Sequence, residues 1–358
     1  MTRLLVVDDS ALMRKLLTEI FSSEADFQVE TAGDGIQAIT KLHLFKPDVI
    51  TLDVNMPNMD GLACLDRIMI ERPTPVVMIS SLTEEGAEET LEALSLGAVD
   101  FAAKPSGALS LEIDKIADVL VEKVQQAAKA KVSKAARLSE RLRLGTAKLR
   151  TNKATQQPNK SVARRTGEGL VLVGTSTGGP PALDQLLSPL PKDFGWPILI
   201  AQHMPATFTG SLARRLDKIC ALQVQEVSKP QALEPGCAYV GRGDADLIVV
   251  RRASGLFAMA APLNSELPWH PSVDRLVDSA LDHVAPEQLV GVLMTGMGTD
   301  GADAMTRLHA SGGVTIAEDE ESSVVWGMPG ALVKGGGASL ISPTSEIAGH
   351  LLALVGTR

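Results

Sequence analysis

The sequence has few aromatic residues, few cysteines and no long apolar stretch. Phe, Trp and Tyr make up 3% of its 358 residues, too few for the stacking surface that binds single-stranded nucleic acid. Its three cysteines are scattered without CxxC spacing, which excludes a disulfide framework or a zinc site. The longest apolar runs are strand-sized, far below the roughly 20 residues that span a bilayer. Two acids, Asp8 and Asp9, stand where a signal peptide would stay apolar. We therefore expect a cytoplasmic protein that is not inserted in a membrane and binds no nucleic acid.

The chain is long enough for two or three domains, and its charge is uneven. The formal net charge is −9, yet residues 123–165 carry a local balance of +12, with Glu140 as their single acid. Such a segment is typical of a linker or of an arm that contacts an acidic partner, and we favour a flexible tether. The sequence thus predicts domains at 1–125 and 166–358, joined by a basic linker at 126–165.

Both predicted domains alternate short apolar runs with helical patterns. Continuous apolar runs between helices are typical of parallel strands covered on both faces. The sequence therefore predicts an α/β protein with two doubly wound parallel sheets. The expected strands of the first sheet are residues 4–7, 49–52, 76–79 and 99–103. Those of the second are residues 170–173, 197–201, 290–295 and 314–317.

Acidic residues follow two strands of the first domain directly. Asp8, Asp9 and Asp53 would share the carboxyl edge of the sheet, where ligands of parallel α/β folds bind. Two carboxylates about 4 Å apart repel by roughly 4 kcal/mol, so the cluster needs a cation, and an all-oxygen site favours Mg²⁺. Lys104 follows the last strand and can reach the same edge. With Mg²⁺ and Lys104 beside it, Asp53 could accept a phosphoryl group. Taken singly, each acid could instead be a solvated turn residue or a helix N-cap.

The segments VVDDSALMR, DVITLDVNMPNMDG, PVVMISS and GAVDFAAKP closely resemble receiver domains of two-component response regulators. The resemblance covers residues 3 to about 122 and implies a flavodoxin-like fold. It also implies that a histidine kinase phosphorylates Asp53. Mg²⁺ would be held by Asp8, Asp9, Asp53 and the carbonyl of Asn55.

The same resemblance implies three residues that respond to the phosphoryl group. Lys104 would contact its oxygens, Ser80 would be the switch hydroxyl, and Phe101 the switch aromatic. Asn55 departs from related methylesterases, which often have an acid there, and this leaves the phosphoryl lifetime open.

The second domain has a serine, a histidine and an aspartate after three different predicted strands. Ser176 lies in the sequence Gly-Thr-Ser-Thr-Gly between a strand and a helix, the context of a nucleophile elbow. His203 and Asp300 each follow another strand. A serine nucleophile needs a base, and the base needs an orienting acid. The three strand ends therefore predict a serine-hydrolase site.

Each member of this set has alternatives. Ser176 could cap a helix or its loop could bind phosphate, although no GK[ST] follows as in a P-loop. His270 competes with His203 as the base. Asp303 and the acidic run 318–321 compete with Asp300. The chain order Ser, His, Asp also differs from that of α/β-hydrolases.

The segments VGTSTGGPPAL, IAQHMPATFTGSLARRL, PSVD, LMTGMGTDGA and VVWGMPG resemble the catalytic domain of chemotaxis protein-glutamate methylesterases, the CheB family. The likeness covers residues 168 to about 355 and implies a Rossmann-like domain without a cofactor. It implies Ser176 as nucleophile, His203 as base and then acid, Asp300 as orienting carboxylate, and the Met297 amide as oxyanion donor.

With the receiver in front, the resemblance implies an esterase that phosphorylation activates. Its substrates would be glutamate methyl esters on methyl-accepting chemoreceptors, with receptor glutamines deamidated by the same chemistry. The phosphodonor would be a histidine kinase of the chemotaxis pathway, of the CheA type. Two other functions compete: a signalling regulator whose C-terminal domain only binds a partner, and a DNA-binding response regulator. The acidic α/β sequence after residue 166 argues against the second of these.

Overall fold

The computed structural model describes residues 1–24, 26–104, 113–130 and 167–358, which form an N-terminal and a C-terminal unit. Most of the predicted basic linker lies outside the described residues. Its first residues do not, because the last helix of the N-terminal unit continues to Lys129. No helix among the described residues is long and apolar enough to cross a membrane.

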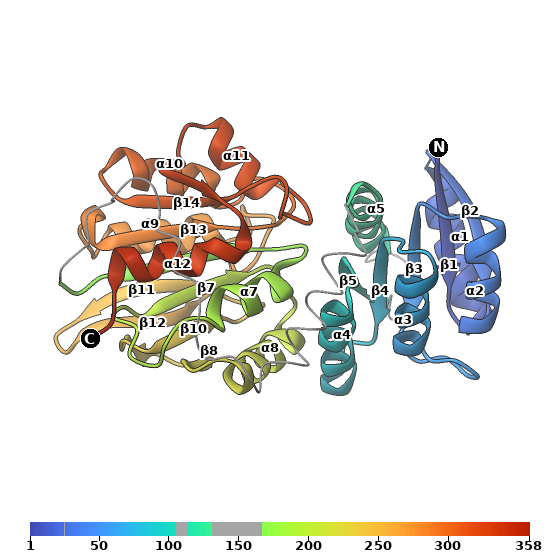
Figure 1. The fold of residues 1–358 in the computed structure, drawn as a ribbon, viewed down its shortest axis with the longest axis horizontal. Helices are drawn as coiled ribbons and strands as arrows, with labels where there is room; N and C mark the ends of the chain where they lie inside the picture. The colour runs from blue at the N-terminus through green and yellow to red at the C-terminus, as the bar shows by residue number, and fades with distance from the viewer. Residues whose placement is uncertain (25, 105–112, 131–166) are drawn as a thin grey trace. The chain divides into compact units, whose positions relative to one another are not determined.

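The N-terminal unit contains a five-stranded parallel sheet in the order β2-β1-β3-β4-β5 (Figure 1). This is the flavodoxin-like order, with its switch point between β1 and β3. Val7 pairs with Leu52 there, so the residues that follow them meet at the carboxyl edge. The strands are β1 Thr2–Val7, β2 Phe27–Ala32, β3 Val49–Asp53, β4 Val76–Ser80 and β5 Asp100–Ala103.

Helices cover both faces of this sheet. On one face α2 packs on α3 and α3 on α4, while α1 contacts α5 on the other. Four helices begin at a side chain that accepts a hydrogen bond from the first turn, which fixes their starts. These caps are Ser10, Asp34, Asp60 and Thr83. The helices are α1 Ala11–Ser23, α2 Gly35–Leu44, α3 Gly61–Glu71, α4 Glu84–Leu96 and α5 Ile113–Lys129.

The C-terminal unit contains a seven-stranded parallel sheet in the order β15-β14-β13-β6-β7-β10-β8. The chain starts in the middle at β6, runs outward through β7, and returns to the other side of β6 at β13. The switch point therefore lies between β6 and β13, where such folds bind ligands. The strands are β6 Leu170–Thr175, β7 Ile198–Gln202, β8 Gln223–Val227, β10 Cys237–Gly241, β13 Leu289–Leu293, β14 Val314–Glu318 and β15 Leu340–Ser342.

A small antiparallel sheet is inserted in this unit, which the sequence patterns did not predict. It has the order β11-β12-β9, with β9 Gln231–Ala232, β11 Asp246–Arg252 and β12 Gly255–Ala261. The parallel sheet is covered by one helix group in which α7 contacts α8 and α12, and another in which α10 contacts α9 and α11 (Figure 1). The helices are α7 Gly179–Leu187, α8 Ala206–Ile219, α9 Val273–Leu281, the short η1 Pro286–Gln288, α10 Ala302–Ala310, α11 Met328–Lys334 and α12 Thr344–Val355.

Candidate functional sites

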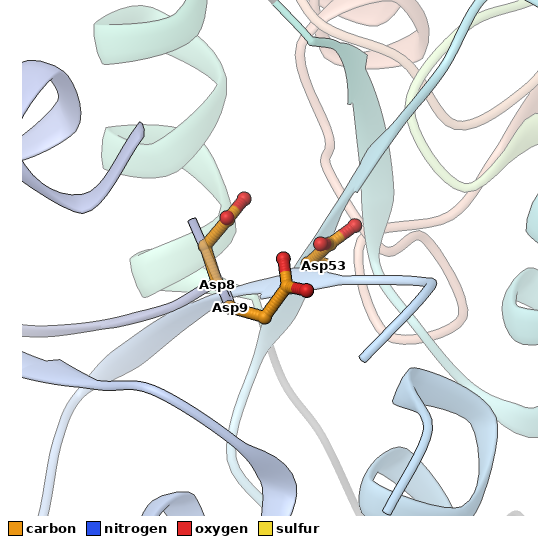
Figure 2. Close-up of side chains that lie close together, drawn as sticks. All are labelled: Asp8, Asp9 and Asp53. Atoms are coloured by element: carbon orange, nitrogen blue, oxygen red, sulfur yellow. The ribbon is translucent and has the colours of Figure 1, made fainter. Parts of the chain in front are cut away.

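The predicted acidic cluster is present at the carboxyl edge of the N-terminal sheet. Figure 2 shows the side chains of Asp8, Asp9 and Asp53 together, and one oxygen of each lies within 4.8 Å of the others. Asp8 and Asp53 are buried, whereas Asp9 is exposed. The Nζ atom of Lys104 lies 2.7 Å from an Asp53 oxygen and 3.4 Å from an Asp8 oxygen. The cluster thus combines three carboxylates with one ammonium group.

The negative charge of the two buried carboxyls, Asp8 and Asp53, is only partly balanced by the single ammonium group of Lys104. Burial raises the pKa of both Asp8 and Asp53, although Lys104 lowers both. Burial alone would lower the pKa of Lys104. The hydrogen bond and the charge of Asp53 outweigh this effect, so the pKa of Lys104 is raised overall. Oδ2 of Asp8, the oxygen 3.4 Å from Lys104, is buried and accepts no hydrogen bond from the residues that the structure describes. An all-oxygen site with such an atom fits Mg²⁺.

The other predicted receiver residues surround this cluster. Asn55 is the second residue after β3, and its backbone N–H donates to Asp53 at 3.3 Å. Its side chain donates to Glu89 of α4. Ser80, at the end of β4, is buried and its hydroxyl donates to the carbonyl of Gly86 in α4 at 3.1 Å. Phe101 is buried in β5. Asn55 and Ser80 therefore both form hydrogen bonds to residues of α4.

Ser176 occupies the turn between β6 and α7. Its N–H donates to the carbonyl of Thr295, and its own carbonyl accepts from Gly179 N–H. Gly178 has a φ of +77°, a left-handed conformation that side chains disfavour. Pro180 and Pro181 follow in the first helical turn, where no N–H partner is needed. The serine thus lies at a sharp strand-to-helix turn, as the Gly-Thr-Ser-Thr-Gly pattern predicts.

His203 lies one residue beyond β7, next to the serine strand. Thr175 pairs with Gln202 in the sheet, and the N–H of His203 donates to the carbonyl of Thr175 at 3.0 Å. The Nε2 atom of His203 lies 2.8 Å from Oδ2 of Asp300. Its Nδ1 atom is buried and has no hydrogen-bond partner within the described part of the chain. Because Nε2 is engaged by Asp300, Nδ1 is the nitrogen that remains for proton transfer.

Asp300 is held at the N-terminus of α9. Besides His203, it accepts hydrogen bonds from the N–H groups of Val273 and Asp274 and from the hydroxyl of Ser272. Its side chain is 8% exposed. Burial alone would raise its pKa, but His203 and these N–H donors lower it overall. Asp300 is therefore an ionised, fixed acceptor that orients the imidazole.

Met297 lies in the loop after β13, beside the serine turn. The neighbouring Gly296 approaches Ser176 so closely that a Cβ added there would lie 2.8 Å from the serine Cβ. Met297 is buried, and its N–H is bonded to no other backbone group in the part of the chain described. The loop is anchored by Thr295, whose N–H donates to the buried carboxyl of Glu318 at 2.6 Å.

The competing residues have other contacts. His270 donates through Nδ1 to the fully buried Asp246, which also binds Arg275. Asp303 is exposed on α10. Glu318 supports Thr295 rather than a histidine, and burial raises its pKa. Among these candidates, His203 is the histidine that borders the serine turn, and Asp300 is the acid that it contacts.

Two residues of this site, Gln202 and Trp269, were not predicted from the sequence. The buried amide of Gln202 donates to the carbonyls of both Ser176 and His203, each at 3.0 Å, and so ties the two turns together. The ring of Trp269 stacks on the ring of His203. A glutamine directly before a predicted base could have suggested the first contact, but Trp269 is 66 positions away in the chain.

Comparisons with known proteins agree with both sites. Residues 4–113 match the response regulator receiver domain family, and residues 171–351 match the CheB methylesterase family. A protein-glutamate methylesterase/protein-glutamine glutaminase 2 of Rhodopseudomonas palustris is 55% identical over 98% of both chains. A protein-glutamate methylesterase/protein-glutamine glutaminase 3 of Rhodospirillum rubrum is 52% identical over 99% of this chain and 96% of its own.

Among solved structures, the catalytic domain of the Thermotoga maritima CheB methylesterase matches the C-terminal unit. It covers 53% of this chain and 100% of its own, with 36% identity and a TM-score of 0.51. The chain therefore belongs to the CheB family of response regulators, which join a receiver domain to a methylesterase domain.

Proposed function

We propose that this chain is a phosphorylation-activated protein-glutamate methylesterase that also deamidates protein glutamines. Its substrates are the γ-methyl esters and amides on methyl-accepting chemoreceptors, and it acts in the cytoplasm in chemotaxis adaptation. The observation that carries the proposal is the His203–Asp300 pair beside Ser176, in a chain that is 55% identical to such an enzyme over 98% of its length. The receiver comprises residues 1–125 and the esterase residues 166–358.

The first half of the reaction acylates the serine. Ser176 Oγ attacks the ester carbonyl carbon while Nδ1 of His203 takes the hydroxyl proton. The carbonyl oxygen becomes an oxyanion that Met297 N–H stabilises. Asp300 stabilises the imidazolium that forms and keeps its ring oriented. The C–O bond to the methoxy group then breaks, and His203 returns the proton to release methanol.

The second half releases the product. Water attacks the acyl-serine carbonyl as His203 takes one of its protons, and a second oxyanion forms at the Met297 amide. The bond to Ser176 Oγ breaks, the serine regains its proton from His203, and glutamate is freed. With a glutamine substrate the same steps expel ammonia instead of methanol. No cofactor is needed in this domain.

The receiver supplies the control. Asp53 accepts a phosphoryl group from a histidine kinase of the CheA type, and Lys104 neutralises its oxygens. Asp8, Asp9, Asp53 and the Asn55 carbonyl would hold Mg²⁺, which offsets negative charge during the transfer.

Ser80 and Phe101 form the switch in this proposal. The phosphoryl group favours only the conformation in which the Ser80 hydroxyl bonds to it. The hydroxyl would have to leave its present acceptor, the carbonyl of Gly86. Phosphorylation would thus shift the receiver between two conformations that α4 senses. The basic linker serves as a flexible tether.

The decisive experiment measures methanol release from methylated receptor cytoplasmic fragments, with and without a small phosphodonor and Mg²⁺. We expect the phosphodonor to stimulate release, Ser176→Ala to abolish it, and Asp53→Asn to remove the stimulation alone. Ser188→Ala, an exposed serine at the other end of α7, is the matched control and should behave as wild type. Full release by Ser176→Ala would refute the serine mechanism. No release from any receptor fragment would favour a domain that only binds its partner.

A further inference from the structure

The indole ring of Trp269 is stacked on the imidazole of His203 in a nearly parallel, offset arrangement. The ring centroids are 5.7 Å apart and the planes differ by 11°. Trp269 belongs to the connection between β12 and α9 and is partly exposed, whereas the His203 side chain is only 5% exposed. A residue distant in sequence therefore packs against the predicted base.

The connection that carries Trp269 is fixed on its C-terminal side. The next residue, His270, donates through Nδ1 to the buried Asp246 at 2.8 Å, and the N–H of Ser272 donates to the same carboxylate at 2.8 Å. The Ser272 hydroxyl donates to Asp300 at 3.0 Å. The indole and the imidazole are thus held by one hydrogen-bond network, through Asp246 on one side and Asp300 on the other.

The hydrogen bond to Asp300 restrains the imidazole of His203 at a single atom, Nε2. The bond between Nε2 and Asp300 sets the direction of the ring but leaves it able to tilt about that contact. A flat aromatic ring against its face removes this freedom. The stacked indole also presents π-electron density to the imidazole, which attracts the positive charge that forms during acylation.

We infer that Trp269 is a positioning residue for the reaction, which holds the plane of His203 and stabilises its protonated form. The inference rests on the proposed esterase function and extends it to a residue outside the Ser-His-Asp set. An aromatic ring is required at this position, and apolar bulk alone is insufficient.

Kinetics of two substitutions at Trp269 in the full-length protein show whether the reaction needs an aromatic ring there or only apolar bulk. Trp269→Phe keeps a flat ring and should retain kcat within about threefold. Trp269→Leu keeps apolar bulk and should lower kcat about tenfold, with KM within about twofold of wild type. Equal kcat values for the Leu and Phe variants would overturn the inference. A rise in KM with unchanged kcat would also overturn it, because Trp269 would then bind substrate.

A fluorescence comparison at one fixed pH tests the stack without using activity. An imidazole stacked on an indole quenches its emission, so wild type should emit less strongly than His203→Gln. The neighbouring His270 is hydrogen-bonded to Asp246 instead. The quench should therefore persist in His270→Gln and disappear in both His203→Gln and Trp269→Phe. Its loss in His270→Gln with persistence in His203→Gln would overturn the inference.

The two readouts also separate failure of the inference from failure of the function. An active wild type whose Trp269→Leu variant keeps full kcat leaves the esterase standing and removes the role of Trp269. A wild type that shows the quench but releases no methanol overturns the esterase and, with it, this role.

Discussion

The two units bury aspartates at the same place in their folds, yet they surround them differently. Asp8 follows β1 and Asp53 ends the neighbouring β3, whereas Asp300 lies in the loop that follows β13 of the other sheet. Burial opposes the ionised form of all three. The pKa values of Asp8 and Asp53 are raised by burial despite Lys104, whereas the pKa of Asp300 is lowered because His203 and N–H donors outweigh burial.

The number of donors accounts for this difference. Asp300 accepts four hydrogen bonds from protein groups, so its charge is already satisfied. Asp8 leaves one buried oxygen without a hydrogen bond. An incompletely satisfied carboxylate suits a site that must receive a cation and a phosphoryl group. A fully satisfied one suits a group that must hold a neighbouring ring still through each turnover.

The largest effect should come from Asp300→Asn. The amide oxygen can accept only part of the present bonds, and an NH₂ group facing Nε2 would force the proton of His203 onto Nδ1. That nitrogen could then no longer take the Ser176 proton, so kcat should fall about 10⁴-fold. Methanol release measures this. The exposed neighbour Asp303→Asn is the control and should be normal. An active Asp300→Asn would mean that another group orients His203.

Asp246 is a second buried aspartate that accepts several hydrogen bonds. It tests whether such bonds also contribute to the stability of the folded C-terminal unit. Asp246 is fully buried and bonded to His270 and Arg275, and its pKa is lowered by these partners despite burial. Asp246→Asn should reduce the free energy of unfolding by about 3 kcal/mol, since it leaves the half-buried guanidinium of Arg275 without its buried counter-charge. Because its charged form is favoured in the folded protein, this stabilisation is present above the ordinary aspartate pKa and is lost as the pH falls through the lowered value.

Urea unfolding followed by tryptophan emission measures this change. All three tryptophans lie in the C-terminal unit, so the signal reports on that unit alone. The control is Asp244→Asn, which breaks an exposed ion pair with Arg242 and should change the stability by less than about 0.5 kcal/mol. Equal losses of unfolding free energy in Asp246→Asn and Asp244→Asn would mean that the buried aspartate contributes no more to stability than the exposed one.

The sequence predicted most of what short-range patterns encode. Apolar runs predicted eight of the twelve parallel strands in the described residues and missed β2, β8, β10 and β15. Residues at the ends of the predicted strands do lie together, because parallel strands bring their carboxyl ends to one edge whatever the loops do. The flavodoxin-like order and the membership of the CheB family, which rested on resemblance, are confirmed.

Contacts between distant segments could not be predicted in this way. Trp269 meets His203 only because the inserted antiparallel strands return the chain to the site, and no periodicity marks that path. The choice between His203 and His270 depends on which carboxylate each one reaches, which is a property of the packed fold. The use of Nε2 rather than Nδ1 toward Asp300 likewise follows from ring orientation.

A smaller effect should come from two serines that cap helices in the two units. The hydroxyl of Ser272 accepts from Arg275 N–H and donates to Asp300, whereas that of Ser10 only accepts from Met13 N–H. Both alanine variants should lose about 1 kcal/mol of stability through the lost cap. Only Ser272→Ala should also lower kcat, about fivefold, because it removes a donor from Asp300. A kcat of Ser272→Ala equal to that of wild type would show that the three remaining hydrogen bonds are enough to hold Asp300.

The smallest expected effect is a gain in stability, and it comes from substituting the buried carboxyl of Asp8. Asp8→Asn removes a buried charge and should stabilise the N-terminal unit by about 0.5–1 kcal/mol at pH 7 in EDTA. Because the folded pKa of Asp8 is raised, the wild-type protein loses stability as the pH rises through that value, so the gain should shrink as the pH falls toward 3.8. Mg²⁺ should stabilise wild type but not the variant.

Calorimetry follows this transition, because the N-terminal unit has no tryptophan or tyrosine. Asp9→Asn is the matched control. Asp9 belongs to the same cluster but is exposed. Its variant should lose the Mg²⁺ effect with a smaller gain in EDTA, which separates relief of burial from loss of a metal ligand. A loss of stability in Asp8→Asn without Mg²⁺ would mean that the attraction to Lys104 outweighs burial. The two buried sites would then differ only in degree.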